Sequence, residues 1–176
     1  MPDCVPFYGH GEDPADPAWG AAYAHIADWV GKYYHDDQIF STHYGGITAH
    51  VDQLIATADA DADGGLLGYG GWSDWCPPAG CVACWNRKPE DPLTDPSRNS
   101  VMVSSFYYIS ELRIVAKYAG ILGKAADQQR YSKLADAAAV RFNDVFYDPK
   151  AKTYTEKRTC GEYLSPQTML SLTRYI

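Results

Sequence analysis

Four stretches of this 176-residue chain repeat their apolar residues at the spacing of an α-helix, and this pattern restricts the fold most strongly. The first two predicted helices cover residues 17–34 and about 39–55, and the polar turn 35–37 separates them. The third runs from Ser100 to Gly123, and the fourth follows a short polar segment and ends at Asp148-Pro149. A helix, a short turn and a second helix thus occur twice. Repeated antiparallel hairpins predict an all-α toroid or solenoid.

Several residues mark where these helices begin and end. Asp16-Pro17 is a typical helix start, with Asp16 as the N-cap and Pro17 at the first helical position. Gly123 is a natural C-cap, because glycine adopts the left-handed conformation at low cost. An extended piece is predicted at Thr153-Tyr154, and Ser165-Pro166 predicts the start of one more helix.

The charge balance limits the classes of partner. The chain is 46% hydrophobic and 21% charged, as expected for a folded globular protein. Its net charge is −7, and no cluster of Lys and Arg occurs, which argues against nucleic acid or an anionic membrane as a partner. No apolar stretch approaches the roughly 18 residues that a membrane-spanning helix needs. The sequence does not indicate a compartment.

The cysteine and histidine patterns do not predict a metal site. Cys76, Cys81 and Cys84 lie in one loop, but a structural zinc site needs four ligands, usually from two Cys-x2-Cys pairs. Cys81 and Cys84 have this spacing, and the sequence offers no second pair. A local disulfide from Cys76 to Cys81 or Cys84, or free thiols, are the alternatives. No cofactor is predicted either.

The long segment 65–99 contains the strongest functional motif. Residues 68–78 read Gly-Tyr-Gly-Gly-Trp-Ser-Asp-Trp-Cys-Pro-Pro, so that Asp74 lies between Trp72 and Trp75 on a Gly/Pro-rich loop. A carboxylate can accept hydrogen bonds from sugar hydroxyls while flat aromatic rings cover the C–H faces of the sugar. The alternative is a buried loop in which Asp74 caps a backbone turn. Long loops without regular structure are usually functional, which favours sugar binding.

Four motifs in matching order resemble the bacterial-type α-L-rhamnosidases. They are Asp-Pro-Ala-Trp-Gly-Ala-Ala at 16–22, Tyr-His-Asp-Asp at 34–37, the aromatic loop at 69–78, and Ser-Ser-Phe-Tyr at 104–107. The resemblance covers nearly the whole chain. It implies that residues 1–176 form part of a six-hairpin (α/α)6 catalytic barrel, in which segment 65–99 is the substrate-binding loop.

The resemblance also implies a reaction and a set of sugar-binding residues. The family hydrolyses terminal α-L-rhamnosides with inversion, so a rhamnose-containing glycoside or polysaccharide is the expected partner. Trp19 matches an aromatic residue of the sugar subsite, and Asp74 matches a carboxylate that contacts rhamnose hydroxyls. Trp75 is a weaker match, and Trp72 matches by position alone. The sequence departs from the family at Trp72-Ser73, where a glycine more often precedes the aspartate, so the shape of the subsite is open there.

Both catalytic carboxylates are expected outside this chain. The general acid of the family is a Glu in an Arg-Glu-Arg segment upstream of the motif at 16–22, and the base is a Glu in a later hairpin. This sequence contains no Arg-Glu-Arg segment. The isolated chain is therefore expected to be a fragment without activity.

Two other functions stay open at this point. One is a six-hairpin glycosidase for a different sugar, because one fold supports many specificities. The other is a non-catalytic carbohydrate-binding or structural helical-repeat module. Trp19 could equally be a core residue, and Glu111 and Arg113 are interpreted as structural residues of a helix.

Overall fold

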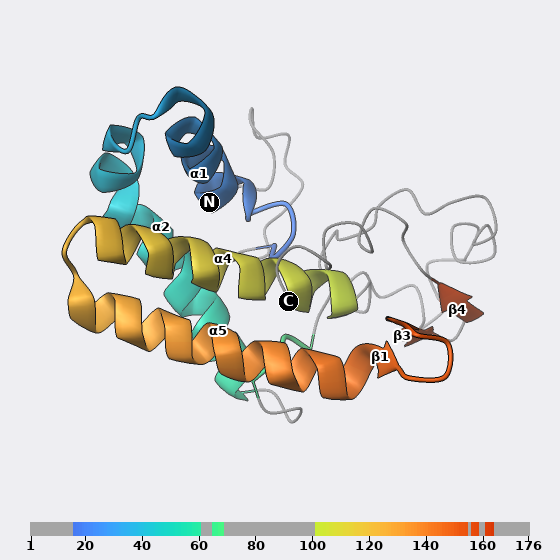
Figure 1. Ribbon diagram of the computed structural model, residues 1–176. Helices are drawn as coiled ribbons and strands as arrows, with labels where there is room; N and C mark the ends of the chain where they lie inside the picture. The colour runs from blue at the N-terminus through green and yellow to red at the C-terminus, as the bar shows by residue number, and fades with distance from the viewer. Residues whose placement is uncertain (1–15, 61–64, 69–100, 155, 159–160, 164–176) are drawn as a thin grey trace, which may run out of the picture.

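In the part of the chain that the structure describes, the architecture is all-α, as predicted. The computed structural model describes residues 16–60, 65–68, 101–154, 156–158 and 161–163. The helices there are α1 (Ala22–Tyr34), α2 (Gln38–Ala60), α4 (Val101–Ile121) and α5 (Ala125–Phe146), shown in Figure 1. None of them is long and apolar enough to cross a bilayer.

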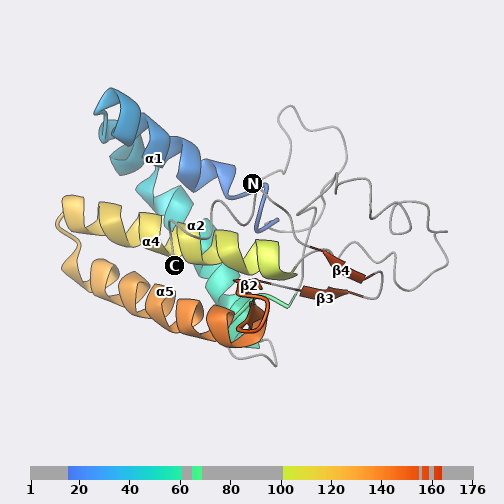
Figure 2. The ribbon, with the colours of Figure 1, turned by 45° about the vertical axis from the view of Figure 1, so that its right-hand side comes forward.

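The helices form two antiparallel hairpins, α1 with α2 and α4 with α5. Helices α4 and α5 lie side by side along their length, and α1 and α2 both pack on α4 (Figures 1 and 2). The turns 35–37 and 122–124 lie at the same end of the bundle in both views. Residues 16–21, the start of α4 and the end of α5 therefore lie toward the opposite end, which we call the loop end.

The two short turns follow from their own residues. His35 closes α1 in the left-handed conformation, with φ 56°, and the Asp36 carboxylate accepts a hydrogen bond from the first N–H of α2 at 2.9 Å. Gly123 has φ 72°, and the N–H of Lys124 donates to the carbonyl of Ala119 at 2.8 Å, which closes α4 in a Schellman motif. The predicted C-cap role of Gly123 is confirmed.

The predicted start of the first helix at Pro17 is wrong, because residues 17–21 form a tight turn instead. The Asp16 carboxylate caps this turn, accepting hydrogen bonds from the N–H groups of Ala18 at 2.9 Å and Trp19 at 2.7 Å. The N–H of Ala22 reaches back three residues to the Trp19 carbonyl at 3.2 Å rather than four. This tighter bonding delays the regular helix to Ala22.

Helix α5 ends at Phe146, slightly before the predicted end at Asp148-Pro149. Two short antiparallel hairpins follow it: β1 (Tyr147–Asp148) with β2 (Thr153–Tyr154), and β3 (Glu156–Arg158) with β4 (Gly161–Tyr163). The Asp148 carboxylate accepts from the N–H of Lys150 at 2.8 Å and fixes the first turn. The predicted extended piece at Thr153-Tyr154 is confirmed, whereas the second hairpin was not predicted.

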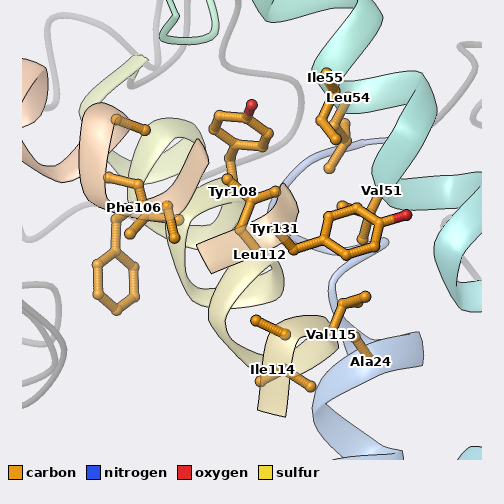
Figure 3. Close-up of a cluster of buried hydrophobic side chains, with 14 of the residues drawn as sticks. Ala24, Val51, Leu54, Ile55, Phe106, Tyr108, Leu112, Ile114, Val115 and Tyr131 are labelled. Atoms are coloured by element: carbon orange, nitrogen blue, oxygen red, sulfur yellow. The ribbon is translucent and has the colours of Figure 1, made fainter. Parts of the chain in front are cut away.

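Helix α4 lies at the centre of the core. It is buried on almost every side, whereas α5 buries one face and exposes the other. Figure 3 shows the α4 side chains Leu112 and Val115 among Val51 of α2, Ala24 of α1 and Tyr131 of α5. Both hairpins therefore share one hydrophobic core, in which α1, α2 and α5 pack on α4.

Candidate functional site

The turn at residues 16–21 presents a tryptophan at the loop end of the bundle. Trp19 is 37% exposed, whereas Asp16 in the same turn is 3% exposed. The Asp16 carboxylate holds the backbone of Ala18 and Trp19, and the Asp16 carbonyl accepts from the N–H of Gly20 at 2.9 Å. The backbone that carries the indole is therefore fixed, while part of the ring can be reached by a ligand.

Gly20 is the point at which this turn packs on the helices. A Cβ atom at Gly20 would press against the Asp16 carbonyl oxygen and would lie 3.0 Å from Cε1 of His50. The turn therefore has no space for a side chain at this position. The imidazole of His50, on α2, forms the surface on which the turn lies.

His50 in turn faces a fully buried carboxylate. Its Nε2 lies 3.2 Å from Oε2 of Glu111 on α4, and the side chains are 6% and 0% exposed. Neither atom has a partner at hydrogen-bonding angles among the described residues, so the two side chains form a close polar contact rather than an aligned hydrogen bond. Burial raises the pKa of Glu111, and the neighbouring imidazole partly opposes this shift.

Sequence reasoning placed Glu111 on a helix as a structural residue but missed its partner. The available signal was His50 itself, a polar residue on the buried face that Ile47, Val51 and Leu54 define on α2. Pairing a buried histidine with a buried glutamate would have pointed to this contact, because buried polar groups generally have polar neighbours.

A second histidine lies in an aromatic cluster between α1 and α4. His25 places Nε2 3.2 Å from the hydroxyl of Ser110, and its ring makes edge contacts with Trp29 and Tyr107 at centroid distances of 6.0 and 5.8 Å. Burial lowers the pKa of His25, and the nearby Asp28 carboxylate opposes this effect. Burial also raises the pKa of Tyr107.

The lowered pKa of His25 predicts a loss of stability in mild acid. Below pH 6.5, the ordinary pKa of histidine, the unfolded chain binds this proton more readily than the folded chain does. The free energy of unfolding should therefore fall as the pH drops through 6.5 toward the lower folded pKa. Urea denaturation of the chain and of His25→Asn at several pH values measures this. The variant should lose less stability over that interval, and parallel curves would contradict the prediction.

The other predicted site residues lie outside the described residues. These are Asp74, Trp72 and Trp75, together with the cysteines of the same loop. The part of the loop at 65–68 is described, and Leu66 and Leu67 are buried there. Within the described ranges, no three His, Cys, Asp or Glu side chains group together as metal ligands.

Comparison with known proteins decides the family. Residues 1–169 match the family model described as the bacterial alpha-L-rhamnosidase 6 hairpin glycosidase domain. The chain belongs to this rhamnosidase family. The resemblance stated from the sequence motifs is confirmed, and so is the all-α, six-hairpin fold class.

A solved structure supports the same assignment. The alpha-L-rhamnosidase from Dictyoglumus thermophilum is 30% identical, with a TM-score of 0.62 over 80% of this chain. The aligned region is 14% of that rhamnosidase, so the chain spans a small part of its length. No curated protein matches the chain.

Proposed function

We propose that this chain forms the rhamnose-binding part of a glycosidase domain that hydrolyses terminal α-L-rhamnosides with inversion. The family match over residues 1–169 carries the proposal. The partly exposed Trp19, fixed at the loop end by Asp16, supports it as the place where a sugar would bind.

Each residue of the proposed site would have a separate role in sugar recognition. The indole of Trp19 would cover a C–H face of the sugar, and the carboxylate of Asp74 would accept hydrogen bonds from its hydroxyls. Trp75 and Trp72 would add further aromatic surface. Asp16 would keep the Trp19 backbone in place, so that little ordering is needed when the sugar binds.

We further propose that the general acid and base lie outside residues 1–176, so that this chain is part of a longer catalytic domain. Inversion needs two accessible carboxyl groups roughly 6.5–9.5 Å apart. The sequence contains no Arg-Glu-Arg segment like the one that carries the general acid in the family. Of the carboxylates buried among the described residues, Asp16 caps a turn and Glu111 is inaccessible to solvent, so neither fits these roles. An apolar stripe on α1, with Ile26, Trp29 and Tyr33 each at least 51% exposed, is consistent with further helices packing there.

Titration with L-rhamnose, followed by calorimetry, tests the role of Trp19. Trp19→Ala should weaken binding about fivefold, because an aromatic contact of this kind contributes about 1 kcal/mol. Trp29→Ala is the matched control, since it removes another exposed indole from the same part of the chain. Equal losses in both variants would contradict the proposed role of Trp19. Hydrolysis of p-nitrophenyl α-L-rhamnoside by the purified chain would contradict the proposal that the catalytic pair lies elsewhere.

A further inference from the structure

We propose that His50 and Glu111 are positioning residues, which hold the Trp19 turn in the geometry that binds the sugar. The inference rests on the proposed function, because it assigns a task to residues that would act through Trp19. Two contacts connect these residues. Glu111 on α4 lies against His50 on α2, and His50 packs against Gly20 in the turn.

The first contact fixes the imidazole. Glu111 is completely buried, and His50 Nε2 lies 3.2 Å from its carboxyl oxygen. Arg113, two residues further along α4, lies 3.5 Å from Asp136 of α5 instead. A buried polar group is costly without a polar neighbour, so the side chain of Glu111 favours one position of the His50 ring.

The second contact, between the His50 ring and Gly20, makes the position of the turn depend on the position of the ring. Gly20 packs so closely on the ring that even a Cβ atom would lie 3.0 Å from Cε1 of His50. Gly20 directly follows Trp19, and its N–H is bonded to the Asp16 carbonyl at 2.9 Å. A shift of the ring toward the turn would therefore press on the short backbone segment that carries the indole.

The polar character of the pair supports a positioning role. Replacing both partners of a buried polar contact by apolar side chains of similar shape is often nearly neutral, so such a contact is weak support for stability alone. It does favour one arrangement over others, because a displaced ring would leave the buried polar atoms of Glu111 without a polar neighbour. The arrangement favoured here is the one that supports the Trp19 turn.

The test uses the indole N–H resonances of the whole chain, with that of Trp19 assigned through Trp19→Phe. In Glu111→Gln, which keeps the size of the side chain and replaces one carboxyl oxygen by an amide NH2 group, the Trp19 resonance should shift or broaden. The Trp29 resonance should stay in place. The affinity for L-rhamnose should fall about tenfold, because the contact that positions the turn is changed.

A matched control separates positioning from general destabilisation. Tyr131→Phe removes a partly buried polar contact elsewhere in the core, the 3.0 Å hydrogen bond from the Tyr131 hydroxyl to Asp52, and should leave the Trp19 resonance unchanged. His50→Gln provides a second variant should Glu111→Gln fail to fold. An unmoved Trp19 resonance in a folded variant of either residue would overturn the inference. Absence of rhamnose binding by the unmodified chain would instead overturn the proposed function, while the resonances would still decide the positioning role.

Discussion

Replacing Phe40 with alanine is expected to lower the free energy of unfolding by about 3–5 kcal/mol. Phe40 on α2 is completely buried, and its ring stacks on Tyr118 of α4 with a centroid distance of 4.0 Å and an interplanar angle of 7°. The substitution would remove this stack and leave a cavity between the first hairpin and the central helix. Urea denaturation followed by circular dichroism measures the loss.

Tyr34→Ala is the control for the Phe40 variant. It also removes an aromatic ring, but Tyr34 is 79% exposed, so the free energy of unfolding should change by no more than about 0.5 kcal/mol. Equal effects of the two substitutions would contradict the central position of Phe40 in the core.

Replacing Gly20 with alanine is expected to cost about 1–3 kcal/mol and to disturb the Trp19 turn. The new Cβ atom would meet the Asp16 carbonyl oxygen, which belongs to the backbone, and the ring of His50. The turn must then open, so we expect weaker L-rhamnose binding in addition to the loss of stability. Denaturation and calorimetric titration of the same variant measure both effects.

Gly45→Ala provides the matched control for Gly20. Gly45 lies within α2, and no atom is within 4 Å of the position that its Cβ atom would occupy. Alanine there should stabilise the helix by about 0.5–1 kcal/mol, because it restricts the unfolded chain more than glycine does. A Gly20 variant that behaved like the Gly45 variant would contradict the close packing of the turn.

The helices could be predicted from the sequence because each buries apolar residues at a regular spacing, and because local residues close the short turns. Gly123 could be assigned as a cap from its identity alone. The start of α1 could not, since the hydrogen bonds from Ala22 to Trp19 and from Tyr23 to Gly20 span three residues and interrupt the regular helical pattern there. The hairpin of β3 and β4 was also missed, because its strands are three residues long and too short to show a pattern.

The site residues Trp19 and Asp74 stay predictions, Trp19 from the family resemblance and Asp74 from its place between two tryptophans on a Gly/Pro-rich loop. The contacts that support the Trp19 turn could not be predicted from the sequence. The contact of His50 with Glu111 joins two helices that are distant in the sequence, and neither residue belongs to a motif. Such contacts depend on how the helices pack, which the spacing of apolar residues does not determine.

The most direct test of the proposed function is a calorimetric titration of this chain with L-rhamnose, compared with Asp74→Asn. We expect saturable binding by the chain and a clear loss of affinity in the variant, because the amide cannot replace the charged acceptor for the sugar hydroxyls. Binding that is absent, or that Asp74→Asn leaves unchanged, would contradict the assignment of a rhamnose site to this chain.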